Sequence, residues 1–136
     1  MSEQEISDVE SSEFVKAIKE GYESLNTNEK FKEQFRDINF KLLLNPTDRD
    51  FAALITVDKG IVSVEGIKNT PKEKISKEVL GWDSYVKTTR QTFKEIGDGT
   101  LSSSDIRKKV LTRKIKVKGL KYLVSFGKMS ALRRVE

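Results

Sequence analysis

The sequence predicts an α+β fold, and three observations support this class. Apolar and polar residues alternate over 38–67, which is typical of strands joined by short loops. Segments on both sides of this region carry apolar residues at helical spacing instead. Near the end, a short basic strand over 114–118 stops at Gly119 and leads directly into an apolar helix. The expected order is helices, an antiparallel meander, helices, a last strand and a closing helix.

The N-terminal part predicts an unstructured acidic tail over 1–11, followed by two helices. Ser12 suits the N-cap of the first helix, whose apolar residues recur every three or four positions: Phe14, Ile18, Tyr22 and Leu25. The polar run 26–28 breaks this pattern, and a second helical segment carries Phe31, Phe35 and Ile38. Either segment could pack its apolar side on a sheet.

The middle of the chain predicts an antiparallel meander. Three strands are expected, over 38–44, 51–57 and 61–67. The tripeptide Asp58-Lys59-Gly60 suits a tight hairpin turn between the second and the third. After a turn at 69–71, a fourth strand is predicted over 74–80.

Helical patterns return in the C-terminal half. Asp83 suits the N-cap of a helix to residue 96, with Trp82 just before it and these residues on one side: Tyr85, Val86, Thr89, Phe93 and Ile96. Ser102 and Asp105 have capping-box spacing and begin another helix. In that helix we expect Ile106, Val110 and Leu111 to face inward.

The closing helix, from Leu120, is apolar on two sides. At about 100° per residue, one face comprises Leu120, Leu123, Val124, Gly127, Ala131 and Val135. A second face comprises Tyr122, Phe126 and Met129. We expect the first face to cover the core. The second face then needs a partner, a membrane or a ligand.

Composition restricts the possible functions. The chain of 136 residues suits a single domain over 1–136. It contains no cysteine and no histidine, which excludes disulfides, the usual zinc sites and His- or thiolate-based catalysis. Turn chemistry accounts for Asp48 and Asp50 better than a catalytic carboxylate cluster with Asp37 does. We therefore expect no enzyme activity, no metal and no cofactor. No apolar run approaches the ~18 residues of a membrane span, and the acidic start does not suit a signal peptide, so a cytoplasmic location is expected.

Charge is distributed unevenly. The segment 107–121 has eight basic residues and no acidic one, whereas 1–13 has five acidic residues and no basic one. Alternate lysines over 114–118 are expected on an edge strand, where they prevent edge-to-edge pairing. Arg107, Lys108 and Lys109 are expected on a helix and are less easily explained. They are our candidates for docking to an anionic membrane surface or another anion, with a plain solvated surface as the alternative.

The end of the chain resembles the sterol carrier protein-2-like lipid-transfer domain family. The specific match is the basic strand Lys114-Ile115-Lys116-Val117-Lys118 with its trailing Gly119, followed by a hydrophobic helix. The hairpin turn at 58–60 and a central helix over 83–96 also resemble the family pattern, and the likeness extends from about Phe31 onward. Two positions depart from it: family members usually have a glycine near Thr112-Arg113 and often an acidic or amide residue in place of Leu120.

The resemblance implies a five-stranded, mainly antiparallel sheet covered by helices and enclosing a hydrophobic cavity. It also implies noncatalytic binding and transfer of a fatty acid, acyl-CoA, sterol or phospholipid, with the terminal helix in the cavity wall. The candidates for lipid contact are Trp82, Tyr85, Phe93, Val110, Tyr122, Phe126 and Met129. Ordinary core packing is the alternative for Trp82, Tyr85 and Phe93.

Two other functions remain open on the sequence. The basic segment 107–121 could bind nucleic acid, although no aromatic residue is interleaved in it before its end. Alternatively, Tyr122, Phe126 and Met129 could form a homodimer or another protein interface. For the lipid carrier we expect a monomer or a weak homodimer.

Overall fold

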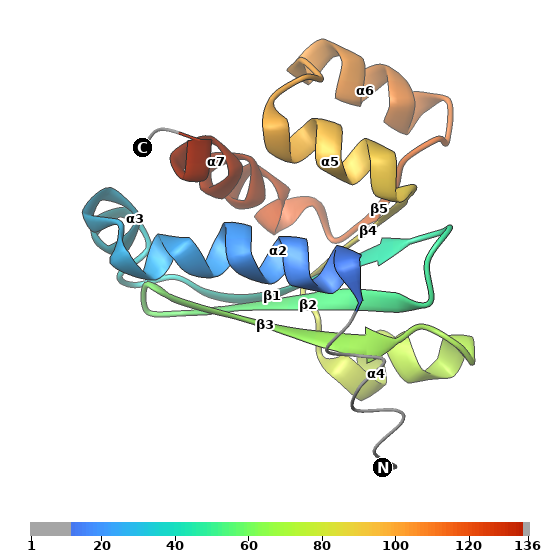
Figure 1. The fold of residues 1–136 in the computed structure, drawn as a ribbon, viewed down its shortest axis with the longest axis horizontal. Coiled ribbons are helices and arrows are strands. Elements are labelled where there is room, and N and C mark those ends of the chain that lie inside the picture. Colours follow the sequence, from blue (N-terminus) through green and yellow to red (C-terminus); the bar gives the residue numbers. More distant parts are fainter. Residues whose placement is uncertain (1–11, 135–136) are drawn as a thin grey trace.

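The computed structural model describes residues 12–134 as a sheet with helices on both faces. Helices α2 (Glu13–Glu23), α5 (Arg90–Asp98) and α7 (Leu123–Arg134) cover one face, and α4 (Lys77–Leu80) lies on the other (Figure 1). The remaining helical elements are η1 (Ser24–Thr27), α3 (Glu29–Gln34), η2 (Lys72–Ile75), α6 (Ser103–Leu111) and η3 (Leu120–Tyr122). The predicted tail over 1–11 and Val135 lie outside the described residues.

The sheet has five strands in the order β3-β2-β1-β4-β5, which confirms the predicted fold class. The strands are β1 (Asn39–Pro46), β2 (Phe51–Asp58), β3 (Ile61–Lys68), β4 (Ser84–Thr88) and β5 (Lys116–Lys118). Only the β1–β4 pair is parallel among these. Because β1 is central and both faces are covered, Leu42, Leu43 and Leu44 are all buried rather than alternating.

The hairpin between β2 and β3 forms as predicted. Lys59 and Gly60 both have positive φ, 51° and 80°, as a two-residue hairpin of this kind requires. Asp58 pairs with Ile61 at the end of the β2–β3 ladder, so only Lys59 and Gly60 form the loop. The first helix is also confirmed, since the Ser12 side chain accepts a hydrogen bond from Val15 N.

The strand predicted over 74–80 was wrong. This segment forms η2 and α4 instead. The Ser76 side chain accepts a hydrogen bond from Val79 N, and Gly81 ends the helix in the left-handed region at φ 68°. Ser76 and Gly81 therefore supply both caps of a one-turn helix, and this local chemistry outweighs the alternation of apolar residues.

The single helix predicted over 83–96 was also wrong. Its first part is the strand β4, and α5 begins only after Thr89, whose side chain caps it through Thr92 N. Asp83 does not cap a helix, because its carboxylate accepts a hydrogen bond from Lys41 N at 2.9 Å. The β-branched and aromatic residues of β4 suit a strand that pairs with neighbours on both sides. The number of strands is thus as predicted, but the fourth strand is a different segment.

The prediction of which side of the closing helix covers the core was wrong: the opposite side faces the core. Met129 and Phe126 are buried, whereas Val124 is 70% exposed and Gly127 and Ala131 are also exposed. The packing partners decide this orientation: the ring of Phe126 lies 5.5 Å from that of Tyr22, and Tyr122 stacks on Phe40 at 4.7 Å. The helix therefore buries the side with Phe126 and Met129, while of the predicted core face Leu123 is partly buried against the core and Val124, Gly127 and Ala131 face solvent.

Helix α6 follows the predicted capping box but not every predicted contact. Ser102 N donates to the Asp105 carboxylate, and Asp105 N donates to Ser102 Oγ. Ile106 and Val110 pack against the core, whereas Leu111 is 77% exposed, contrary to the prediction, because the helix ends there and the chain turns away.

The turn between α6 and β5 places Arg113 in a backbone conformation that favours glycine. Arg113 has φ 61°, in the left-handed region where glycine is favoured and other residues lose about 1–2 kcal/mol. We expect Arg113→Gly to raise the free energy of unfolding by about 0.5–1 kcal/mol, after the greater freedom of glycine in the unfolded chain is subtracted. Urea denaturation measures this. Lys114→Gly is the control and should lower the stability, because Lys114 has no positive φ.

Candidate functional site

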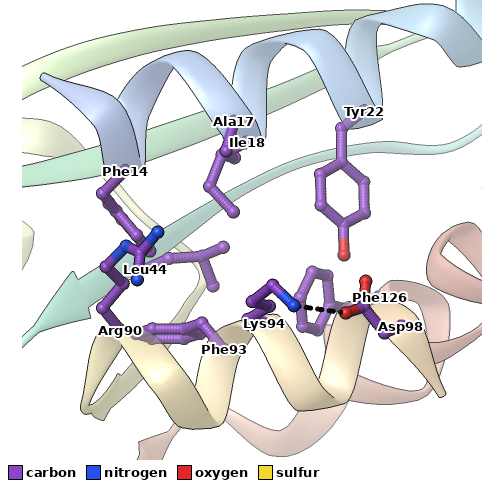
Figure 2. A pocket seen from close by; sticks show the side chains of 11 residues that line it. Phe14, Ala17, Ile18, Tyr22, Leu44, Arg90, Phe93, Lys94, Asp98 and Phe126 are labelled. Atoms are coloured by element: carbon purple, nitrogen blue, oxygen red, sulfur yellow. Dashed lines mark hydrogen bonds and ion pairs between the residues drawn. The ribbon is translucent and has the colours of Figure 1, made fainter. Parts of the chain in front are cut away.

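A cavity of about 190 Å³ lies between α2 and α5 (Figure 2). Helix α2 supplies four lining residues: Phe14, Ala17, Ile18 and Tyr22. Helix α5 supplies Arg90, Phe93, Lys94, Gly97 and Asp98, and Leu44 of β1 and Phe126 of α7 complete the lining. The cavity is therefore bordered by three helices and the central strand, and it is partly open to solvent.

Aromatic pairs define the two ends of this cavity. The rings of Phe14 and Phe93 lie 5.3 Å apart, and those of Tyr22 and Phe126 lie 5.5 Å apart. Both Phe14 and Tyr22 belong to the predicted apolar side of α2, whose spacing directs them to the same face. All four aromatic residues are buried. The space between the pairs is consequently apolar where these four rings border it.

The charged lining residues all belong to α5. Lys94 and Asp98 are exposed and form an ion pair at 3.2 Å, one turn apart. Arg90 is half-buried, and its backbone N–H donates to the Asp48 carboxylate at 2.9 Å, which anchors the start of α5 beside the end of β1. The cavity thus combines an apolar interior with Arg90 and the Lys94–Asp98 ion pair on one wall.

A buried hydrogen bond joins α2 to α7 beside the cavity. Tyr22 Oη and Ser130 Oγ lie 2.6 Å apart, and both residues are almost fully buried. We expect Tyr22→Phe to lower the free energy of unfolding by about 1–2 kcal/mol, because Ser130 Oγ then loses this partner. Denaturant unfolding of Tyr22→Phe, Ser130→Ala and the double variant checks the expectation. The double variant should cost less than the sum of the two, and strict additivity would contradict it.

The structure brings two of the predicted lipid residues to the cavity. Phe93 and Phe126 line it. Val110, Tyr122 and Met129 belong to the same apolar core but not to the cavity wall. The alternative of a protein interface through Tyr122, Phe126 and Met129 is not supported, because the chain itself buries Phe126 and Met129 and stacks Tyr122 on Phe40.

Trp82 and Tyr85 lie on the other face of the sheet. They belong to a second apolar cluster with Leu43, Ala52, Leu54 and Ile75. Along β4, Tyr85 and Val86 point to opposite faces, and Val86 belongs to the core beneath α2, α5 and α7. The helix predicted for this segment had placed Tyr85 and Phe93 on one side, and the strand separates them.

The basic residues Arg107, Lys108 and Lys109 lie on α6, which is farther from the strands than α5 (Figure 1). Arg107 and Lys108 are exposed, and none of the three lines the cavity. Hydrogen bonds with Ser102 lower the pKa of Asp105 on the same helix, with smaller contributions from Lys108 and Lys109. The stabilisation by this capping box is therefore present above about pH 4 and is lost as the pH falls through the lowered pKa.

Sequence reasoning missed most of the cavity wall. Phe14, Ile18 and Tyr22 were expected to cover the core, and no pattern distinguished a core side chain from one that borders a void. Arg90 and Lys94 were hidden by the error over 83–96. Had Thr89 been taken as the N-cap, the spacing would have placed Arg90, Lys94 and Gly97 on one side of α5.

Residues 12–134 contain neither a candidate metal site nor a membrane-spanning helix. No group of histidine, cysteine or carboxylate side chains there could hold a metal ion. No helix in this part of the chain is long and apolar enough to span a bilayer.

Comparison with known proteins identifies the fold. No protein-family model and no curated protein matches the sequence. Among solved structures, a UbiJ-SCP2 ubiquinone synthesis protein is similar over 100% of this chain and 98% of its own, with TM-score 0.64 and 12% identity. A crystal structure of sterol carrier protein 2 covers 91% of this chain and 98% of its own, with TM-score 0.63 and 14% identity.

Two further structures extend this comparison. Apo sterol carrier protein 2 from Yarrowia lipolytica covers 94% of each chain, with TM-score 0.55 and 15% identity. The sec-alkylsulfatase Pisa1 from a Pseudomonas species matches 74% of this chain but only 14% of its own length, with TM-score 0.54 and 17% identity. At such identities the similarity concerns the fold alone. In its sheet, its helices and its chain order, this protein has the sterol carrier protein 2-like fold.

Proposed function

We propose that this chain binds and transfers a lipid, and that the cavity between α2 and α5 holds part of its aliphatic chain. The observation that carries the proposal is the apolar lining by buried aromatic and aliphatic side chains from α2, β1, α5 and α7. Two structures of the same fold are named as sterol carriers, which supports a lipid as the ligand. The proposed function is noncatalytic, since it needs only burial and release of the ligand.

The size of the cavity favours a single alkyl chain over a sterol. Its volume of about 190 Å³ is below the ~300–1,000 Å³ of typical ligand pockets and close to the ~150 Å³ of a cavity that binds benzene. This is room for about six carbon atoms. At about 0.8 kcal/mol per methylene, their burial contributes roughly 5 kcal/mol, which corresponds to sub-millimolar binding. A longer chain gains affinity only if α2 and α5 move apart.

Arg90 favours an acidic lipid head, since Lys94 is already paired with Asp98. Arg90 and Lys94 stand beside the cavity, and a carboxylate or phosphate there would pair with the Arg90 guanidinium. Within residues 12–134, no ion pair of Arg90 competes with this contact. A fatty acid or another lipid with a negatively charged head therefore fits both parts of the site.

Native mass spectrometry of the freshly purified protein, followed by titration with the fluorescent fatty acid cis-parinaric acid, tests the proposal. We expect either a retained lipid or saturable binding, and transfer of the bound probe to acceptor vesicles. A protein that carries no lipid and shows no saturable fluorescence change would contradict the proposal. Docking of Arg107, Lys108 and Lys109 to the donor vesicles stays a prediction, and flotation with phosphatidylserine vesicles checks it.

A further inference from the structure

A second concave surface lies on the face of the sheet opposite the lipid cavity. We call it the lysine hollow, and its volume is about 550 Å³. Its lining residues are Lys72, Ile75, Ser76, Lys77, Glu78, Trp82, Tyr85, Lys87, Lys116, Val117 and Lys118. Five of these are lysines and one is a glutamate, so the hollow has a net positive charge of four.

The strand register explains why lysines gather here. Tyr85 pairs with Lys118, and Lys87 pairs with Lys116, in the antiparallel β4–β5 ladder. Residues directly opposite each other in such a ladder project to the same face, so these four side chains share the face that carries Trp82. Lys72 and Lys77 approach from η2 and α4, which flank the same hollow. Four separate elements, η2, α4, β4 and β5, thus place cationic groups around one space.

The aromatic floor of the hollow is held in place by hydrogen bonds. Trp82 Nε1 donates to Ile75 O at 3.0 Å, and the Trp82 and Tyr85 rings lie 5.2 Å apart. Asn45 Nδ2 donates to Tyr85 Oη at 3.0 Å, which fixes the Tyr85 ring in the floor. Lys77 Nζ lies 6.0 Å from the centre of the Trp82 ring, so this ammonium group extends over the floor.

The charges of the hollow lack anionic partners in the described part of the chain. The ion pairs found within residues 12–134 involve Lys19, Arg49 and Lys94, none of which lines it. Lysines on an edge strand prevent its pairing with another chain, and this role explains Lys116 and Lys118 on β5. It does not explain Lys87, which is half-buried on the interior strand β4.

We propose that the lysine hollow binds a small organic polyphosphate, a molecule with two or three phosphate groups. The lysines would hold the phosphates as charged donors, and the less polar part of the ligand would pack on Tyr85 and the edge of Trp82. The net charge of four matches such an anion. A flat bilayer surface fits less well, because it contacts projecting residues rather than the floor of a hollow. The proposal does not depend on lipid binding in the cavity between α2 and α5.

Trp82 is the only tryptophan and serves as the reporter for the test. The full chain is titrated with inorganic tripolyphosphate and with adenosine triphosphate, and tryptophan emission is followed at two salt concentrations. We expect a saturable change that weakens at higher salt. The double variant Lys116→Gln and Lys118→Gln should raise the dissociation constant at least tenfold. Both residues are exposed on an edge strand, so thermal unfolding should be unchanged.

The matched control removes the same charge elsewhere, by Lys30→Gln with Lys128→Gln, which are exposed on α3 and α7. It should leave the dissociation constant within twofold of the wild type. No saturable change, or an equal loss in both double variants, would overturn the proposal. The last experiment is flotation with phosphatidylserine vesicles. If Lys116 and Lys118 were needed for binding to the vesicles but not for binding to tripolyphosphate, the polyphosphate proposal would also be overturned. The variant with Lys116→Gln and Lys118→Gln should still bind cis-parinaric acid, which shows that the two proposals are tested independently.

Discussion

Replacement of Gly119 by alanine is expected to lower the free energy of unfolding by about 3 kcal/mol or more. Gly119 has φ 66°, and a Cβ atom there would overlap the carbonyl oxygen of Asp83 and come within 3.2 Å of Ser84 Cα. Ser84 Oγ also donates to Gly119 O, so the two backbones are held together at this point. The contact brings the end of β5 against β4. Both a strained φ and a backbone overlap therefore oppose the substitution.

Two other glycines separate these two costs. Gly81 has φ 68°, but a Cβ atom there would meet no atom within 4 Å, so Gly81→Ala should cost only about 0.5–1 kcal/mol, the strain of a positive φ less the gain from the smaller freedom of alanine in the unfolded chain. Gly127 lies in α7 and also has open space, and Gly127→Ala should be neutral or stabilising by up to ~1 kcal/mol. Urea denaturation of the three variants measures the series. A cost for Gly119→Ala equal to that for Gly81→Ala would contradict the close approach to Asp83.

The sequence was sufficient for the elements whose signals are local. The meander strands, the hairpin turn at Lys59-Gly60, the Ser12 cap and the Ser102–Asp105 capping box all depend on residues close in the chain. The segment 74–88 was misassigned because its short apolar runs fit a helix or a strand equally well. Tertiary pairing decided the outcome: β4 fits between β1 and β5, which lie far from it in the sequence.

The orientation of the last helix could not be predicted for a related reason. Both of its sides contain apolar residues, and helical periodicity alone ranks them equally. The aromatic partners Tyr22 and Phe40, more than 80 residues earlier, select the side with Phe126 and Tyr122. A void is still harder to foresee, because it depends on how four elements meet rather than on any residue type. Hence only Phe93 and Phe126 among the seven lipid candidates line the cavity.

Filling the cavity between α2 and α5 is expected to remove fatty acid binding. Ala17 lines the cavity from α2, yet it remains exposed, so a larger side chain there can enter without displacing a core residue. In Ala17→Phe, the ring would occupy space that the ligand chain needs, since a phenyl group nearly fills a cavity of this size. We expect the dissociation constant for cis-parinaric acid to rise at least tenfold, while the free energy of unfolding changes by less than about 1 kcal/mol.

The matched control is Lys16→Phe, which adds the same ring at a neighbouring exposed position that does not line the cavity. It should bind the fatty acid as the wild type does. A chain-length series checks the size of the cavity: Ala17→Phe should weaken hexanoic and decanoic acid by the same factor, because the cavity holds about six carbon atoms of either chain and both acids lose the same buried methylenes. Wild-type affinity in Ala17→Phe, with its fold intact, would mean that the lipid binds elsewhere on the chain. Ala17→Phe changes the cavity and leaves the sheet unchanged, so its binding result tests the position of the lipid site and not the fold.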